Sequence, residues 1–171
     1  VCALVGGANA VPLTPLVVKP VAPNADITLP IKIDAPVACA RLTGRVIKNL
    51  NANASTPLWM VQRLERAGHR SISALVDITN YVMLTLGQPM HVYDLDAVSG
   101  TLTARMAKSG ESVKLLNEQT HALQDDVLVI ADDEKILGMA GVMGSFDSKA
   151  ELHTKNIFLE SAFFAPEFIQ G

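Results

Sequence analysis

The stretch VDITNYVMLTLGQPMHVYDLD, residues 76–96, changes its hydrophobic period in the middle. Its first half carries apolar residues at helical spacing, and Gly87 then supplies a typical helix C-cap. After this glycine the pattern becomes that of a short β-strand. The stretch also holds Thr79, Asn80 and His91, polar residues that a plain core helix would not need. It therefore predicts a helix-to-strand junction whose polar side chains have a further purpose.

A first short helix is predicted upstream of this junction, in STPLWMVQRLERAGHR, residues 55–70. Ser55 or Thr56 can serve as its N-cap, Pro57 suits the first turn, and Gly68 suits the C-cap. Its predicted apolar face has helical spacing and consists of Leu58, Val61 and Leu64.

A second helix is predicted over residues 71–87, with Ser71 or Ser73 as its cap. Its apolar residues lie at positions 75, 78, 82 and 86. A strand is predicted near residues 42–49, and short β-prone runs separated by Gly, Asn, Asp and Ser follow the helices. The sequence thus predicts an α+β fold, a β-rich mixed domain with flanking short helices.

Composition narrows the class of protein. The chain has 171 residues, of which 49% are hydrophobic and 18% charged, which fits one soluble globular domain. A net charge of −3 argues against a nucleic-acid module that works by electrostatics alone. No run approaches the roughly 18 apolar residues of a membrane span. Cys2 and Cys39 form no CxxC pair, so we expect neither a zinc site nor a disulfide framework, and a reducing cytoplasm suits them.

The beginning of the chain predicts a connector. Residues 1–36 are rich in Ala and Val and contain six prolines, which favour extended linker conformations. The opening lacks an initiator Met and a basic start, so it does not resemble a signal peptide. We expect a Pro-rich arm over residues 1–36, one domain over residues 37–171, and a piece of a longer protein.

Glu160 is the one carboxylate within the apolar run NIFLESAFF, residues 156–164, which predicts a buried strand. A buried, unpaired carboxylate is costly, so it requires a donor, protonation or a ligand. Strand alternation can equally turn Glu160 toward solvent, and the sequence leaves both alternatives open.

The polar residues of the junction also have two interpretations. His91 follows Pro89, which stiffens the chain, so its imidazole can lie at the rim of a pocket or be an ordinary structural side chain. Thr79 and Asn80 can share one target only near a common edge of the helix, because adjacent helical residues point about 100° apart. Otherwise they face water.

The segment ILGMAGVMGS, residues 136–145, contains three glycines in apolar company, which indicates close approach of the backbone to something else or positive φ angles. It lacks the GK[ST] ending of a P-loop and the GxGxxG spacing of a dinucleotide site. The acidic runs DLD and ADDE lack EF-hand spacing, so we predict no dedicated metal site.

Taken together, the motifs VDITNYV, LGQPMH, AGVMG and LESAFF, in this order, resemble the β subunit of bacterial phenylalanyl-tRNA synthetase, in its central editing region. The resemblance covers most of the chain. It implies a β-sandwich of unusual topology with flanking helices, and an activity that hydrolyses tyrosine wrongly attached to the tRNA for phenylalanine.

The resemblance also implies roles for individual residues. Glu160 would bind the tyrosine hydroxyl, and His91 would lie near the ester with Thr79 and Asn80 as polar, catalytic wall residues. Further residues would shape the pocket and leave room for the ring and the terminal adenosine: Pro89, Ala140, Gly141 and Gly144.

Two departures from the family accompany the resemblance. Ser145 stands where the family usually has a second glycine, and the chain ends before the GR and TDAS-like segment, so we expect an incomplete editing site. The resemblance implies an α-subunit partner and tRNA(Phe), with ATP and Mg²⁺ needed only by the whole ligase. A non-catalytic structural or tRNA-binding module of the β subunit is the alternative function.

Overall fold

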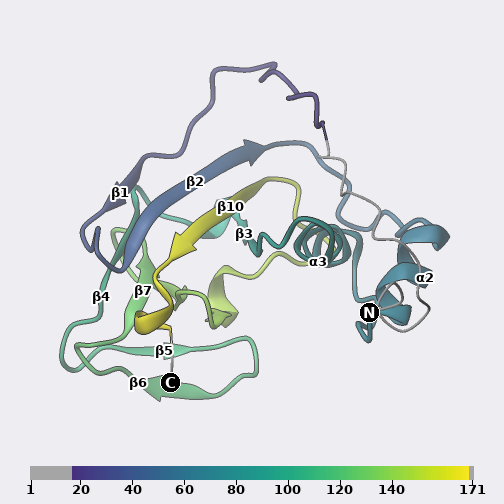
Figure 1. The fold of residues 1–171 in the computed structure, drawn as a ribbon. Coiled ribbons are helices and arrows are strands. Elements are labelled where there is room, and N and C mark those ends of the chain that lie inside the picture. The colour runs from purple at the N-terminus through teal and green to yellow at the C-terminus, as the bar shows by residue number, and fades with distance from the viewer. Residues whose placement is uncertain (1–16, 170–171) are drawn as a thin grey trace.

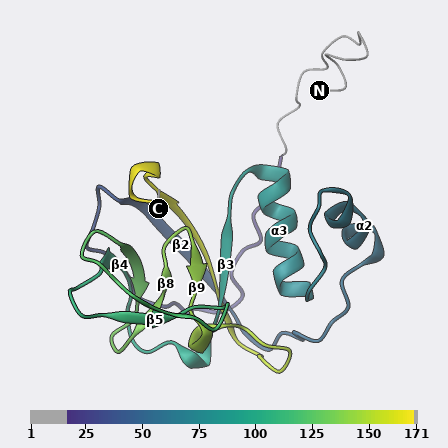
Figure 2. The same ribbon diagram turned by 90° about the horizontal axis from the view of Figure 1, so that it is seen from below.

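The computed structural model describes residues 17–169. In these residues two β-sheets pack on a common core, and two short helices stand beside one edge of them. Both views place helix α3 next to strand β3, with α2 on the far side of α3 (Figure 1 and Figure 2). The chain thus has the predicted α+β fold.

One sheet is antiparallel and has the order β2-β10-β3. Strand β2 spans Cys39–Ile47, β10 spans Ile157–Phe164 and β3 spans Met90–Asp94. The strands predicted near 42–49 and within 156–164 are confirmed, with β2 beginning three residues earlier than predicted. In this sheet β10 lies between β2 and β3, so the last strand of the chain contacts the strand that follows the helix-to-strand junction.

The second sheet has the order β1-β4-β7-β8-β9. Only β1 and β4 run parallel in it, and the other neighbouring strands are antiparallel. The bounds of the five strands are Ile31–Ile33 for β1, Leu102–Met106 for β4, Leu128–Ala131 for β7, Ile136–Met139 for β8 and Met143–Gly144 for β9.

Strand β7 is buried on both faces. Leu128 and Ile130 belong to the core shared with the three-stranded sheet, whereas Val129 and Ala131 pack into a second cluster on the opposite face. That face is covered by a hairpin of β5, Ser112–Lys114, and β6, Thr120–Ala122. A continuous apolar strand is expected where both faces are covered. Short 3₁₀ turns complete the fold at Leu95–Ala97, Phe146–Ser148 and Pro166–Phe168.

Helix α2 spans Leu58–Arg66, as the sequence predicts, but its start differs from the prediction. Neither Ser55 nor Thr56 caps it, because Pro57 occupies the N-cap position and no side chain closes this end. The Thr56 hydroxyl instead donates a hydrogen bond of 2.5 Å to the Asp77 carboxylate of the next helix. A tertiary contact has replaced the local cap.

The predicted apolar face of α2 is also partly wrong. Leu58 is 71% exposed, while Met60 and Leu64 are the residues that the helix buries. On the neighbouring surface, Trp59 and Tyr81 meet edge to face and the Arg63 side chain stacks against both rings. This exposed contact ties α2 to α3.

Helix α3 spans Ala74–Leu86 and has both predicted ends. Ser73 is its N-cap and accepts a hydrogen bond from the Val76 N–H, and Gly87 ends the helix in the left-handed region at φ +72°. Its interior face differs from the prediction, because Ile78 and Leu86 are exposed. The fully buried position is Asp77, and Thr79 is buried beside it.

Asp77 has no exposed surface and accepts three hydrogen bonds. Their donors are the hydroxyls of Thr56 and Ser71 and the backbone N–H of Ile72. Burial raises the pKa of this carboxyl, but the three donors outweigh burial and lower the pKa below its usual value. The ionised group therefore fastens the start of α3 to the segments on either side of α2.

The end of the predicted Pro-rich arm joins the sheet. Residues 1–16 lie outside the described part of the chain, and residues 17–30 contain no helix or strand. Ile31–Ile33 then form β1 and pair with β4. The division of the chain at residue 36 stays a prediction. Within residues 17–169 no helix has the length and apolar character needed to cross a lipid bilayer.

Candidate functional site

A cavity of about 720 Å³ lies where both sheets meet the end of α3. Its walls come from β3 and β10 of one sheet, from β7, β8 and β9 of the other, and from the loop after Gly87. Most of the lining is apolar, from Met, Phe, Ile, Val, Pro and Ala side chains and glycine backbone. Few polar side chains reach it, so those that do determine what it can bind.

Glu160 is one of these polar residues, and it is 5% exposed. It lies on β10 directly opposite His91 of β3, so both side chains project from the same face of the sheet. One carboxylate oxygen, Oε2, accepts a hydrogen bond of 2.5 Å from the Tyr93 hydroxyl. Among the described residues the other oxygen, Oε1, has no hydrogen-bond partner. The sequence left open whether the Glu160 side chain is buried or faces solvent, and the structure shows that it is buried.

Burial raises the pKa of Glu160 to about 7, although the hydrogen bond from Tyr93 lowers it in part. The carboxyl group therefore titrates near neutral pH instead of near its usual value. When it is ionised, Oε1 is a strong acceptor for a hydroxyl group that enters the cavity. The pKa of Tyr93 lies well above its usual value, chiefly because of burial, so the phenol remains protonated and continues to donate.

His91 lines the cavity with an unpartnered ring nitrogen. Its Nε2 atom is buried and makes no hydrogen bond to any described residue. The imidazole ring packs edge to face against Tyr93, with 4.5 Å between the ring centroids. Burial lowers the pKa of His91 to about 4, so the ring is neutral at neutral pH. A neutral imidazole with a free nitrogen can orient a water molecule or a polar group of a ligand.

Gly144 lets β9 approach the imidazole ring. A Cβ atom at this position would lie 2.5 Å from Nε2 of His91 and closer still to Cε1. Gly138 is equally restricted by the backbone of β9, where a Cβ atom would lie 2.9 Å from the Met143 carbonyl oxygen. The glycines of this segment thus bring the two sheets together beside His91, which is the close approach that the sequence predicted.

Gly141, Ala140 and Pro89 also line the cavity, and their role in substrate binding stays a prediction. Gly141 has φ +70°, in the region that favours glycine. Pro89 lies in the loop between α3 and β3. The side chain of the preceding Gln88 holds this loop to β10 with a hydrogen bond of 3.1 Å to the Ala162 carbonyl.

Thr79 and Asn80 are not brought to the cavity with the other predicted residues. Thr79 is buried inside the helical layer, where its hydroxyl donates to the carbonyl of Val76, one turn earlier. Asn80 is half-buried on α3. Their assignment as catalytic residues has no support from this arrangement and stays a prediction.

Tyr93 is the residue that sequence reasoning missed. It lies on the cavity wall, is 2% exposed and contacts both His91 and Glu160. Strand periodicity could have found it, because residues two apart on β3 share one face. Its pairing with Glu160 depends on the register of β3 against β10, which the local sequence does not determine.

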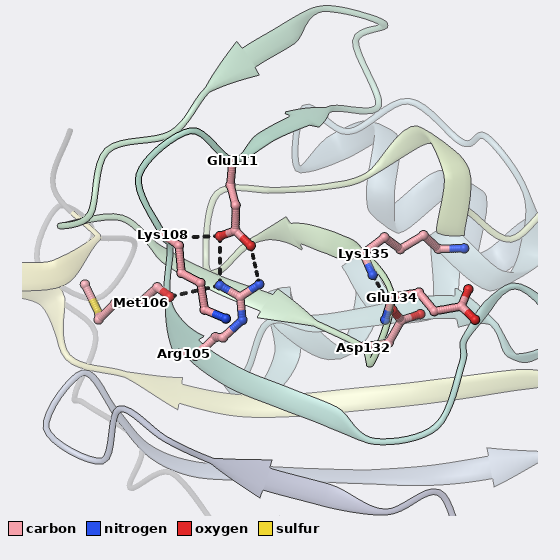
Figure 3. A network of polar contacts seen from close by, with 7 residues as sticks. All are labelled: Arg105, Met106, Lys108, Glu111, Asp132, Glu134 and Lys135. Atoms are coloured by element: carbon pink, nitrogen blue, oxygen red, sulfur yellow. Dashed lines mark hydrogen bonds and ion pairs between the residues drawn. The ribbon is translucent and has the colours of Figure 1, made fainter.

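Two other polar networks are structural (Figure 3). Arg105 forms a two-pronged ion pair with Glu111, whose carboxylate also accepts the backbone N–H of Lys108. Asp132 accepts backbone N–H groups from Glu134 and Lys135 at the turn between β7 and β8. The first network closes the connection from β4 to β5 and the second the turn between β7 and β8, and neither lines the cavity. Within residues 17–169 no three His, Cys, Asp or Glu side chains converge as metal ligands would.

The chemistry available in the cavity follows from this inventory. The described lining contains no Ser, Thr, Cys or Lys side chain, so it offers none of these nucleophiles. It offers one carboxylate oxygen, one neutral imidazole ring and mainly apolar walls. The fold and the cavity therefore define an α+β domain with a mainly apolar cavity into which a buried carboxylate and a neutral imidazole project.

The chain belongs to the B3/4 domain family, whose model matches residues 38–171. Among curated proteins it is similar to phenylalanine–tRNA ligase β subunits. It is 55% identical to that of Chromobacterium violaceum, covering 93% of this chain and 20% of the relative. It is 54% identical to that of Dechloromonas aromatica, covering 99% of this chain and 21% of the relative. The chain thus spans about one fifth of the length of these relatives.

Among solved structures the chain is similar to an N-terminal fragment of the phenylalanyl-tRNA synthetase β subunit from Pyrococcus horikoshii. The TM-score is 0.62 and the identity 13%, and the match covers 87% of this chain and 47% of the other. This likeness concerns the fold. The homologues in bacteria carry the sequence relationship and confirm the family resemblance that the motifs indicated.

Proposed function

We propose that this chain is the editing module of a phenylalanine–tRNA ligase β subunit and hydrolyses tyrosine esterified to tRNA(Phe). The observation that carries the proposal is the buried Glu160 carboxylate, which lines an apolar cavity and keeps one oxygen without a partner. A tyrosine side chain matches this site, since its ring fills apolar space and its hydroxyl can donate to Oε1.

A second site of this kind has a physical purpose. A synthetic pocket shaped for phenylalanine rejects an analogue with one added hydroxyl by only about a hundredfold. A site with a buried group that requires the hydroxyl discriminates in the opposite direction, because phenylalanine would leave that group unpaired at a cost of about 1–3 kcal/mol. Glu160 is the group that we assign to this requirement.

We assign ester hydrolysis to a water molecule that the cavity positions beside the ester. His91 contributes its unpartnered Nε2 atom, which can accept a hydrogen bond from that water or orient it. The terminal ribose hydroxyl of the substrate can assist. Direct attack of water on the ester needs no covalent enzyme intermediate. Holding the water and the ester together would supply much of the rate acceleration.

The glycine segment fits the remainder of the substrate. Gly141 and Gly144 replace side chains with backbone on the wall opposite Glu160, and Ala140 adds only a methyl group. A Cβ atom would meet the His91 ring at Gly144 and the Ile169 and Phe164 side chains at Gly141, so these glycines let the walls pack closely. The aromatic ring and the terminal adenosine would occupy the cavity between those walls. Pro89 fixes the loop at the edge of the same cavity.

The activity of the whole enzyme extends the proposal beyond this chain. We propose that the complete protein attaches phenylalanine to tRNA(Phe) in protein biosynthesis, in the cytoplasm, together with an α subunit. We propose that ATP and Mg²⁺ bind in other modules of the whole enzyme. No step of the editing reaction is assigned to them.

The proposal is tested by deacylation of Tyr-tRNA(Phe) and Phe-tRNA(Phe) by the intact two-subunit enzyme that contains this chain. The parent should clear the tyrosyl ester faster. Glu160→Ala should reduce the ratio of the two rates by roughly tenfold, the value of one hydrogen bond to a charged group. Glu134→Ala, at an exposed turn outside the cavity, is the matched control and should keep the parental ratio. Equal ratios for parent and Glu160→Ala would contradict the assignment.

A further inference from the structure

The Tyr93 hydroxyl and the Glu160 carboxylate form a buried pair inside the cavity. Tyr93 comes from β3 and Glu160 from β10, and the register places them diagonally on one face of the sheet. Tyr93 presents to Glu160 the same chemical group, a phenol, that a tyrosine ligand would present. The carboxylate thus has one oxygen engaged by the protein and one oxygen available.

The ring of Tyr93 has little freedom to move away. On one side it packs against the His91 imidazole, with centroids 4.5 Å apart, and on the other it contacts the Phe158 ring at 6.4 Å. Phe158 is itself 1% exposed and packs over Gly44. The hydroxyl is therefore held in place, and with it the orientation of the carboxylate that it contacts.

We propose that Tyr93 is a specificity-determining positioning residue: its hydroxyl engages Oε2 of Glu160 and so directs Oε1 toward the cavity to accept one ligand hydroxyl. This inference rests on the proposed function. It adds that discrimination between tyrosine and phenylalanine depends on a residue that acts only through Glu160.

The charge state of Glu160 supports this role. Burial raises its pKa to about 7, and the hydrogen bond from Tyr93 is the contact that lowers it. The other titratable groups near it are the neutral His91 on β3 and the Cys39 thiol on β2, whose pKa burial and the Glu160 charge raise. The wall from the five-stranded sheet, Ile130 and residues 138–144, carries no titratable side chain. Tyr93 therefore helps to keep Glu160 ionised at neutral pH.

The preference for the tyrosyl ester should depend on pH through the charge of Glu160. An ionised carboxylate accepts a hydroxyl hydrogen bond more strongly than a protonated one. The preference for the tyrosyl ester should therefore rise with pH, with a midpoint near the pKa of Glu160, about 7. Removing the Tyr93 hydroxyl removes a contact that lowers this pKa, so the midpoint should move to higher pH.

The experiment uses Tyr93→Phe in the intact two-subunit enzyme, with deacylation of both esters measured across a pH series. The ratio of tyrosyl to phenylalanyl rates should fall by roughly tenfold near neutral pH. The midpoint of the ratio should rise by about one pH unit. Tyr81→Phe is the matched control, because this tyrosine lies outside the cavity and hydrogen-bonds Arg63. It should leave the ratio and the midpoint at their parental values.

The outcomes separate the two claims. If the parent does not prefer the tyrosyl ester at any pH, the proposed function fails. If the parent prefers it and Tyr93→Phe keeps both the ratio and the midpoint, the proposed function stands and the role of Tyr93 is refuted. A purely structural role would slow both esters equally without moving the midpoint, which also refutes it.

A second variant covers the case in which Tyr93→Phe fails to fold. Tyr93→3,5-difluorotyrosine keeps the ring and hydroxyl but makes the phenol a stronger hydrogen-bond donor. The stronger donor should lower the pKa of Glu160 further, so the midpoint should shift to lower pH, opposite to the shift in Tyr93→Phe. An unchanged midpoint in this variant would overturn the inference.

Discussion

Gly144→Ala adds one methyl group at the place where β9 meets His91. The new Cβ atom would lie 2.5 Å from Nε2 of His91, whereas nonbonded heavy atoms normally stand about 3.5–4.0 Å apart. The ring or the strand must therefore move by roughly 1 Å. The imidazole cannot simply tilt away, because the Tyr93 ring packs against it.

This displacement should lower both the stability of the protein and the rate of deacylation. Overpacking a dense region costs about 1–3 kcal/mol, which should appear as a lower free energy of unfolding in urea denaturation. A misplacement of about 1 Å in a reacting site can cost roughly a hundredfold in rate. We therefore expect kcat/KM for deacylation of Tyr-tRNA(Phe) by the intact enzyme to fall by about that factor.

Gly110→Ala provides the control for this prediction. Gly110 has φ +86° and no atom within 4 Å of an added Cβ, so its substitution costs backbone strain without touching the cavity. It should lower stability by about 1 kcal/mol and leave deacylation unchanged. Parental kcat/KM in Gly144→Ala would refute the placement of His91 and the glycine segment at the reacting site.

Two further predictions concern stability. Asp77→Ala removes the acceptor of three buried hydrogen bonds and should lower the free energy of unfolding by about 3 kcal/mol in urea denaturation. The control Asp125→Ala, at an exposed position, should change it by less than about 0.5 kcal/mol, and equal effects of the two variants would contradict the role of Asp77. Glu160 has a folded-state pKa of about 7 against 4.5 for the free group, so the folded state binds more protons and the parent should lose stability as pH rises between these values. Glu160→Gln removes this loss, so its free energy of unfolding should rise by about 3 kcal/mol relative to that of the parent as pH increases from about 4 to 8. A difference in free energy of unfolding that stays constant over this pH range would contradict the raised pKa of Glu160.

Local signals predicted the helices and the β-rich body well. Ser73 and Gly87 set the ends of α3 through contacts within a few residues, so the sequence around them was sufficient. Thr56 failed as a predicted cap because its hydroxyl has a partner 21 residues away, in Asp77. Asp77 was passed over for a related reason: a charged residue in an apolar helix pattern suggests an exposed position unless its donors are known.

The sequence indicated which residues belong to the candidate site better than it indicated how they are arranged in space. Glu160 was conspicuous because it interrupts an apolar strand, and the glycine segment was conspicuous by composition. The meeting of Glu160 with His91 depends on the register of β10 against β3, and that of Gly144 with His91 depends on the packing of the two sheets; both are set by residues far apart in the chain. Strand periodicity places Tyr93 on the same face as His91, but its contact with Glu160 could not be predicted because it depends on this same register.

The central claim is that the cavity holds the side chain of tyrosine with its hydroxyl on Glu160. The most direct measurement is a crystal structure of the intact two-subunit enzyme with a non-hydrolysable tyrosyl-adenosine analogue. We predict that the phenolic oxygen lies within hydrogen-bond distance of Oε1 of Glu160, with the linkage to the ribose beside Nε2 of His91. An analogue bound elsewhere in this chain, or in this cavity with its phenol turned away from Glu160, would contradict the account.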